Sequence, residues 1–230
     1  MDTILDRASR FRGDIFAKES ALYQRLAHDG QNPKVLMISC ADSRVVPEII
    51  TQARPGDLFV CRNAGNIVPP FSQANGGVSS AVEYAVVALK VRDIIVCGHS
   101  DCGAMKAFLH PEALAEMPNV ATWLRHAHAA ECVVNAAYPS LEEKHKVHAL
   151  AMENVITQIH HLRTHPSVAA ALARGELSLH GWFFEIDSGN ILAFDGTTRK
   201  FVAVEDDAPL PVALSSDEAV APQMRWATGR

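Results

Sequence analysis

The fold is decided around Lys34-Val35-Leu36-Met37-Ile38-Ser39, a short and almost wholly apolar run that follows Pro33. Such runs are typical of strands that are buried on both faces of a parallel sheet. Two further runs of this kind lie at residues 58–61 and 94–97, and segments with helical patterns at 46–52 and 82–89 separate the three runs. This alternation predicts an α/β fold with a mostly parallel central β-sheet that is flanked by helices.

The segments on either side of this pattern extend the prediction to the rest of the chain. Between residues 2 and 28, apolar side chains recur at helical intervals among charges, which predicts one or two amphipathic helices ahead of the sheet. Further helices are predicted at 120–135 and 146–164. Residues 177–186 and 191–194 flank a Ser-Gly turn and predict an antiparallel strand addition. The segment 206–230, rich in proline, alanine, serine and acids, is predicted to be a flexible tail.

Composition limits the classes of function. The 230 residues are 48% hydrophobic, and 21 basic minus 26 acidic residues give a net charge of −5 without a long basic run. We therefore expect one core-rich domain over residues 31–205, with no nucleic-acid partner and no membrane association. No signal peptide or membrane span is evident, and five cysteines are an odd number for a disulfide framework. These features favour a reducing, cytoplasmic location.

Two cysteines and a histidine stand where predicted strands end. Cys40 follows the first run, and His99 and Cys102 follow the third. The carboxyl ends of neighbouring parallel strands meet at one edge of a sheet, which is where such folds bind ligands. The set predicts a zinc site with three protein ligands and an open fourth position, as in catalytic zinc sites. The other cysteines, Cys61, Cys97 and Cys132, are interpreted as small buried apolar residues.

Asp42 and Arg44 lie directly after Cys40. If the backbone stays extended, their side chains project to the same side and can form a bidentate salt bridge. Asp42 could then fill the fourth metal position and close the site, or it could hold a metal-bound hydroxide while Arg44 keeps it ionised. A solvated surface pair is the third alternative.

At this point the sequence resembles the β-class carbonic anhydrases, zinc enzymes that interconvert carbon dioxide and bicarbonate. The resemblance covers residues 3–204 and is especially close to bacterial members, including those found with cyanate-degrading enzymes. It rests on five motifs in order: Cys40-x-Asp42-x-Arg44-Val45, Pro55-Gly56-Asp57-Leu58-Phe59, Arg62-Asn63-Ala64-Gly65-Asn66, Glu83-Tyr84-Ala85-Val86 and Gly98-His99-Ser100-x-Cys102-Gly103.

The resemblance implies a function and a set of site residues. It implies one Zn²⁺ per subunit on Cys40, His99 and Cys102, with Asp42 as a fourth ligand only in a closed form. Reversible hydration of carbon dioxide would use zinc-bound hydroxide held by an Asp42–Arg44 dyad. The implied substrate-binding residues are Gln31, which donates a hydrogen bond across a subunit boundary, together with Phe59, Ala64, Tyr84 and Gly103.

The resemblance also implies an assembly. Members of the family form homodimers that often pair into tetramers, and an N-terminal helical arm, here residues 1–30, embraces the partner. One subgroup closes its zinc site and binds inhibitory bicarbonate through a tryptophan, an arginine and a tyrosine. This chain has Met37, Arg62 and Phe184 at those positions. We therefore expect an open site without that regulatory anion pocket.

Two alternative functions remain. The same site could hydrolyse carbon disulfide or carbonyl sulfide, which are linear heterocumulenes like carbon dioxide. A non-catalytic zinc module, with Asp42 permanently on the metal, is the other alternative.

Overall fold

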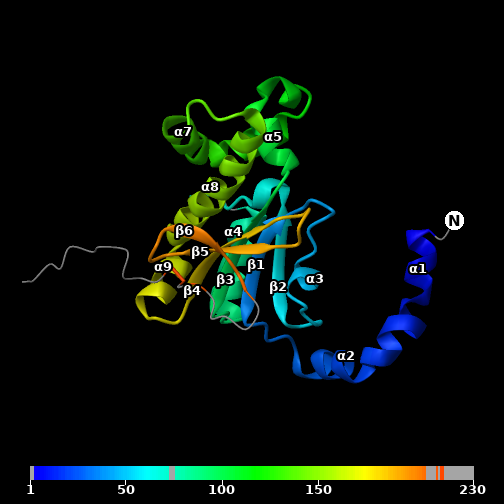
Figure 1. Ribbon diagram of the computed structural model, residues 1–230. Helices are drawn as coiled ribbons and strands as arrows, with labels where there is room; N and C mark the ends of the chain where they lie inside the picture. Colours follow the sequence, from blue (N-terminus) through cyan, green and yellow to red (C-terminus); the bar gives the residue numbers. More distant parts are fainter. Residues whose placement is uncertain (1–2, 73–75, 206–210, 212, 215–230) are drawn as a thin grey trace, which may run out of the picture.

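The computed structural model describes residues 3–72, 76–205, 211, 213 and 214. These residues form a six-stranded sheet with the strand order β2-β1-β3-β4-β5-β6 (Figure 1). The strands are β1 (Val35–Cys40), β2 (Leu58–Asn63), β3 (Asp93–His99), β4 (Ser178–Phe184), β5 (Ile191–Asp195) and β6 (Lys200–Ala203).

The sheet is parallel through its first four strands and antiparallel at its C-terminal edge. β1 pairs with β2 and β3, and β3 pairs with β4, all in parallel. β5 then pairs antiparallel with β4, and β6 with β5. The predicted mostly parallel sheet with an antiparallel addition is therefore confirmed. The sequence did not predict β6, a four-residue strand with an exposed burial pattern at three of its positions.

Helices connect the strands close to where the apolar periodicity predicted them. They are α1 (Ile4–Phe11), α2 (Ala17–Asp29), α3 (Pro47–Ile50), α4 (Gly77–Glu83), α5 (Gly103–Leu109), α6 (Pro118–Leu124), α7 (His128–Ala137), α8 (Glu143–Arg163) and α9 (Pro166–Ala173). Shorter 3-10 or π turns extend several of them: η1 (Arg12–Phe16), η2 (Ala64–Asn66), η3 (Tyr84–Ala88), η4 (Pro111–Leu114) and η5 (Arg125–Ala127). Figure 1 shows α1 and α2 running away from the sheet as a bent arm.

The buried side chains form a large core on one face of the sheet. Leu36 and Ile38 of β1 and Ile94 and Val96 of β3 pack there against helices α4, α8 and α9. A second core lies at the carboxyl ends of β1 and β3, where α5, α6, α7 and α8 meet, and it includes Cys40 and Cys102. The metal-ligand candidates therefore belong to the packed interior.

Close packing between α8 and the sheet depends on glycine. A Cβ atom placed on Gly98 of β3 would lie 2.7 Å from Val155 Cγ2 and 3.2 Å from the Ala151 carbonyl oxygen, both of α8. Gly181 of β4 would meet Ile159 Cδ1 and Val155 Cγ1 at 3.0 Å. These two glycines set the distance at which α8 lies across the sheet, directly beside His99.

Two local predictions differ from the structure. The helical pattern was placed at 82–89, but α4 begins at Gly77 with Gly76 as its N-cap, and the Ser80 hydroxyl donates to the Gly76 carbonyl at 3.2 Å. Cys132 was expected to be buried, but it is exposed on α7. Hydrophobic character alone did not show which side of α7 faces solvent.

The segment 206–230, predicted to be a flexible tail, lies almost entirely outside the described residues. One of its members, Leu214, is buried, and its N–H donates to the Leu179 carbonyl of β4 at 3.0 Å. Across the described part of the chain, no helix is both long enough and apolar enough to cross a membrane.

Candidate metal centre and active site

Three ligand atoms converge at the carboxyl edge of the sheet. Cys40 ends β1, His99 ends the adjacent parallel strand β3, and Cys102 is the N-cap of α5. The Sγ atoms of the two cysteines and a ring nitrogen of His99 all lie within 4.8 Å of one another, and all three residues are buried. The structure thus brings together the residues that the sequence predicted as metal ligands.

The imidazole of His99 is set up to ligate a metal. Its Nδ1 lies 2.8 Å from the Ser100 carbonyl oxygen, which can only accept, so Nδ1 carries the hydrogen and Nε2 carries the lone pair. Nε2 is buried and has no hydrogen-bond partner among the described residues. An unpaired buried polar group costs about 1–3 kcal/mol, which a metal bond would offset. Two sulfurs and one such nitrogen fit the ligand preference of Zn²⁺.

The two thiols are electrostatically linked. A hydrogen bond with Cys102 lowers the pKa of Cys40 to about 4 against the opposing effect of burial, and contacts with His99 and the Gly65 N–H lower it further. The Gly65 N–H lies 3.4 Å from Cys40 Sγ. The hydrogen bond to Cys40, together with burial, raises the pKa of Cys102. A cation bound by both sulfurs would displace any proton that they hold, because thiolates are the metal ligands.

Asp42 and Arg44 form the predicted bidentate pair, but on a turn. Arg44 Nε donates to Asp42 Oδ1 at 3.0 Å, and Arg44 Nη2 donates to Oδ2 at 2.8 Å. The condition of an extended backbone is not met: the Arg44 N–H donates to Asp42 Oδ1 at 3.0 Å and the Val45 N–H donates to the Asp42 carbonyl at 2.9 Å. Hydrogen bonds from Arg44 hold the pKa of Asp42 well below its usual range. Asp42 Oδ2 lies 4.0 Å from His99 Nε2, at the edge of the metal site.

Arg62 supports the same turn from β2. Its Nε donates to the Cys40 carbonyl at 3.1 Å and its Nη2 to the Asp42 carbonyl at 2.8 Å. Met37 is fully buried against Ile95 and Cys97, and Phe184 packs at the edge of that cluster. Arg62 thus stabilises the loop that carries the ligands, while the predicted lack of a regulatory anion pocket stays a prediction.

The loop after β2 closes the site from the other side. Asn154 of α8 donates through Nδ2 to the Gly65 carbonyl at 2.9 Å, and Gln158 Nε2 donates to Asn154 Oδ1 at 2.8 Å. Trp123 Nε1 donates to the Ala64 carbonyl at 2.9 Å. Gly65 has a φ of 78°, a left-handed conformation that favours glycine. The loop is therefore held so that the Gly65 N–H faces Cys40 Sγ and Ala64 lies beside the metal ligands.

Three predicted substrate residues lie elsewhere on this chain. Phe59 pairs with Leu36 near the start of β1, whereas Asn63 pairs with Cys40 at its end. Four residues along a strand correspond to roughly 13 Å. The Phe59 and Tyr84 ring centroids are 5.8 Å apart, and Gln31, exposed, precedes β1 altogether. Phe59 and Tyr84 thus lie together, away from the metal ligands of their own chain, and Gln31 precedes β1 at the end opposite Cys40. Ala64 and Gly103, in contrast, adjoin the ligands.

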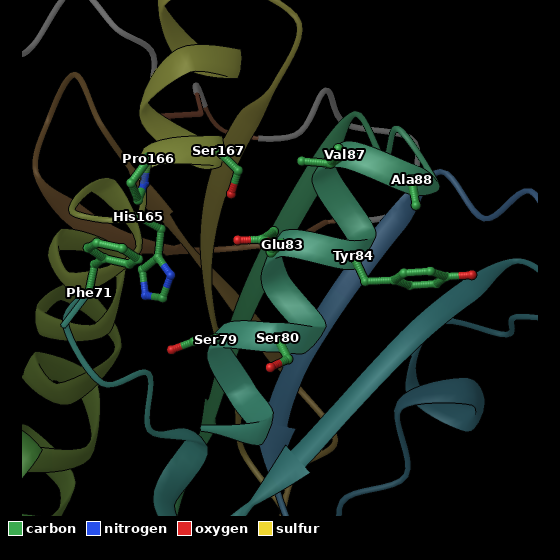
Figure 2. A pocket seen from close by; sticks show the side chains of 10 residues that line it. All are labelled: Phe71, Ser79, Ser80, Glu83, Tyr84, Val87, Ala88, His165, Pro166 and Ser167. Atoms are coloured by element: carbon green, nitrogen blue, oxygen red, sulfur yellow. The ribbon is translucent and has the colours of Figure 1, made fainter. Parts of the chain in front are cut away.

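A cavity of about 380 Å³ lies beside Tyr84, and its lining includes no metal ligand. Figure 2 shows Glu83 and Tyr84 leaving their helix on different sides. Glu83 points toward Ser167, while the Tyr84 ring extends from the opposite side of the helix. The Tyr84 ring, half of it exposed, is therefore presented outward together with Phe59.

Comparison with known proteins decides the family. The family model described as carbonic anhydrase matches residues 35–191, which include all three metal ligands and the Asp42–Arg44 pair. The chain belongs to the carbonic anhydrase family. A carbonic anhydrase of Pseudomonas aeruginosa is 52% identical over 206 residues, which cover 90% of this chain and 93% of the relative. Carbonic anhydrase 1 of Escherichia coli is also 52% identical and covers 88% of this chain and 91% of its own length.

Solved structures place this carbonic anhydrase in the β class, as the resemblance implied. The β-carbonic anhydrase CcaA is 44% identical and aligns with a TM-score of 0.85, over 90% of this chain and 93% of that chain. A tetrameric β-carbonic anhydrase of Sordaria macrospora is 33% identical and aligns with a TM-score of 0.74, over 82% of this chain and 93% of that chain.

Sequence reasoning missed several residues that shape this carbonic anhydrase site. Asn154 and Gln158 are one helical turn apart on the buried face of α8, and their amides among apolar neighbours were the available signal. Asp101, between His99 and Cys102, contacts Arg44. No sequence pattern indicated that contact, because it joins two loops whose residues are 57 positions apart.

Proposed function

We propose that this carbonic anhydrase hydrates carbon dioxide at a site shared by two subunits. One subunit supplies the metal ligands Cys40, His99 and Cys102, the Asp42–Arg44 dyad, Ala64 and Gly103. The partner supplies Gln31, Phe59 and Tyr84. The observation that carries the proposal is that Phe59 and Tyr84 lie together roughly 13 Å along β2 from the metal end of their own chain, while Gln31 precedes β1, at the end opposite Cys40.

Cys40, His99 and Cys102 would hold one Zn²⁺ per subunit, since their donor set and the unpaired His99 Nε2 fit this ion. When bound, Zn²⁺ supplies Lewis acidity that makes water a nucleophile near neutral pH.

The dyad orients the nucleophilic water. Asp42 Oδ2 points to the edge of the metal site and accepts a hydrogen bond from that water, so that its remaining lone pair faces the substrate. Arg44 keeps the carboxylate ionised and fixes its plane through two parallel hydrogen bonds. If Asp42 instead reached the metal, as in the closed form, this acceptor would be lost.

Carbon dioxide is linear and apolar, so it would lie against the rings of Phe59 and Tyr84 and the methyl group of Ala64. As charge develops on the substrate oxygens, it needs hydrogen-bond donors. The Gln31 amide is one donor. The Gly103 N–H is the second, because the first N–H groups of a helix such as α5 have no partner within the helix.

The N-terminal arm supports an assembly of at least two copies. Ile4 and Leu5 are 76% and 77% exposed, and Ile15 is 52% exposed, although all three are large apolar residues on helical segments. Figure 1 shows that α1 lies clear of the body of its own subunit, whereas α2 contacts that body through the Arg54–Glu19 ion pair. A partner that the arm embraces would cover these side chains, in a homodimer or in a tetramer like that of the Sordaria macrospora enzyme.

We also retain the prediction of a cytoplasmic location. All five cysteines are free, and two of them belong to the metal site, where they must stay reduced to bind the ion.

Complementation between two inactive variants tests the shared site. Cys40→Ser removes a metal ligand, and the double variant Gln31→Ala/Tyr84→Ala removes exposed pocket residues with little effect on the fold. In a mixed dimer, a shared site pairs the intact metal half of one chain with the intact pocket half of the other. We expect co-expressed, doubly tagged mixed dimers to recover up to half of the wild-type activity per dimer.

The result that would overturn the shared site is a mixed dimer no more active than either parent. Stopped-flow carbon dioxide hydration, with metal content determined on the same sample, is the assay. Carbon disulfide, assayed on the same wild-type preparation, compares the alternative substrate class directly.

A further inference from the structure

We infer that Asp101 is a positioning residue, which fixes the Arg44 guanidinium and thereby keeps the Asp42 carboxylate off the metal. The inference rests on the proposed role of the Asp42–Arg44 dyad and assigns a function to a residue outside it.

The guanidinium of Arg44 is held from two directions. On one side Asp42 accepts from Nε and Nη2. On the other side Asp101 Oδ2 accepts from Nη1 at 3.0 Å, and the Asp101 carbonyl accepts from Nη2 at 3.3 Å. A flexible arginine side chain, 45% exposed, is therefore fixed between the loop after β1 and the loop after β3.

Asp101 is itself fixed in an unusual conformation. Its φ of 58° lies in the left-handed region, which residues other than glycine, asparagine and aspartate rarely adopt. The neighbouring Ser100 is bonded twice to the end of β4: its N–H donates to the Phe184 carbonyl at 2.9 Å, and its hydroxyl accepts from the Ile186 N–H at 2.9 Å. Lys106 of α5 also donates to Asp101 Oδ1. The second carboxylate thus comes from a rigid loop.

This arrangement is poorly suited to a stabilising role. The side chains of Arg44 and Asp101 are 45% and 53% exposed, and ion pairs between exposed groups contribute about 0–1 kcal/mol. The effect of the Arg44–Asp101 pair is therefore on orientation, because a guanidinium bonded along two edges cannot rotate about its long side chain.

The consequence concerns the distance between Asp42 and the metal. Asp42 Oδ2 is only 4.0 Å from His99 Nε2, so a small movement brings it to the fourth metal position. Two of the three hydrogen bonds to the Asp42 carboxylate come from the Arg44 guanidinium, and the bond to Oδ2 is one of them. The third, from the Arg44 backbone N–H, holds only Oδ1, so a guanidinium that rotates away releases Oδ2, the oxygen that faces the metal site. Loss of Asp101 should therefore populate the closed form, in which Asp42 replaces water on the metal.

The test uses Asp101→Gly, which removes the carboxylate and accepts the positive φ, and Asp101→Asn, which keeps an oxygen acceptor in a residue type that also tolerates this φ. A second cavity, distinct from the one beside Tyr84, is lined by Arg44, Asp101 and Asp187. Asp187→Asn is the matched control, because it removes one negative charge from the same cavity. Each protein is measured at equal zinc content for kcat and KM. X-ray absorption of the zinc-loaded protein and a crystal structure report the metal ligands independently of activity.

We expect Asp101→Gly to lower kcat by about three- to tenfold with KM unchanged, and to show Asp42 on the metal in part of the molecules. Asp101→Asn should recover part of that loss, and Asp187→Asn should match the wild type. An Asp101→Gly enzyme with wild-type kcat and a wild-type ligand set would overturn the inference. Asp42→Asn, measured in parallel, distinguishes failure of the proposed dyad from failure of the Asp101 inference. A fully active Asp42→Asn enzyme would show that the dyad has no role. An inactive Asp42→Asn enzyme beside unaffected Asp101 variants would show that the dyad works without Asp101.

Discussion

The two carboxylate oxygens of Asp42 have different surroundings. Oδ1 accepts from the Arg44 backbone N–H and from Nε, and Oδ2 accepts from Nη2 while facing the metal site. The negative charge of Asp42 therefore binds Arg44 through both oxygens and also faces the metal site through Oδ2.

Asp42→Asn tests that charge. The amide keeps the size of the side chain but places a neutral group, with N–H donors, against Arg44 and the nucleophilic water. Because a positioned proton acceptor contributes about 10²–10⁴-fold, we expect kcat to fall by at least about 100-fold with zinc content unchanged. Stopped-flow hydration with metal analysis measures both quantities. Full activity in a zinc-loaded Asp42→Asn enzyme would exclude the proposed role.

Among single residues, the sequence predicted those that lie at the ends of neighbouring parallel strands. Cys40, His99 and Cys102 could be identified because β1 and β3 are adjacent and parallel, so that their carboxyl ends must meet. The Asp42–Arg44 pair was predicted on the condition of an extended backbone. The backbone forms a turn instead, and the turn also brings the two side chains together. Asp101 could not be predicted, because its contact with Arg44 depends on how two loops face each other in space.

At the scale of elements, the contact between α8 and β3 at Gly98 positions the site. A Cβ on Gly98 would meet the Ala151 carbonyl, a backbone atom that cannot turn aside. We expect Gly98→Ala to lower the free energy of unfolding by about 1–3 kcal/mol, the usual cost of overpacking, and to lower activity because His99 is adjacent.

Gly77→Ala is the control, since a Cβ there meets nothing within 4 Å and its backbone needs no positive φ. Urea denaturation of both variants gives the comparison. Equal stability of Gly98→Ala and the wild type would show that α8 can shift without cost.

The sequence predicted the strands and helices whose own residues show an apolar pattern. β1 and β3 are continuous apolar runs, and α8 has an apolar stripe. The strand β6 was missed because only Phe201 of its four residues is partly buried, so its pairing with β5 leaves almost no apolar signal. The π turns at Arg12–Phe16 and Tyr84–Ala88 were also missed, because an extra residue in a helical turn is set by packing and not by the order of apolar residues.

At the scale of the whole molecule, the exposed apolar residues of the arm predict the oligomeric state. The double variant Leu5→Glu/Ile15→Glu should place two charges where the partner subunit would pack. We expect a smaller species in light scattering coupled to gel filtration, with an unchanged far-ultraviolet circular dichroism spectrum.

The matched control is Met117→Glu/Val133→Glu, which changes two exposed apolar residues, 43% and 47% accessible, outside the arm. An oligomer of unchanged size in the arm variant would contradict the embracing arm.

Acid stability is also a property of the whole fold. Burial lowers the pKa of His161, as does the proximity of His126, His160 and His165, although a hydrogen bond to the Val68 carbonyl opposes this. Burial likewise lowers the pKa of His126. At these two histidines, the unfolded chain binds more protons than the folded chain when the pH is below the ordinary histidine pKa of about 6.5. The neutral histidines therefore contribute fully to the stability of the folded state above the ordinary histidine pKa. That contribution is lost as the pH falls through the lowered pKa that they have in the folded state.

His161→Asn keeps an N–H donor at the Val68 carbonyl and removes the titrating ring. We expect the free energy of unfolding to fall less steeply between pH 6.5 and 5 in the variant than in the wild type. Urea denaturation of both metal-free proteins at each pH measures the difference. Parallel curves for the two proteins would exclude His161 as a source of acid sensitivity.

Cys132 is exposed on α7, whereas Cys40, Cys97 and Cys102 are buried and Cys61 is half-buried. His128 Nε2 lies 3.7 Å from the Cys132 sulfur, within hydrogen-bond distance of the thiol. A bulky maleimide should consequently attach at this one position on each subunit and leave the zinc ligands untouched. A dye or spin label placed there would report the spacing between copies in solution, and a tether would fix the catalyst to a support in a single orientation.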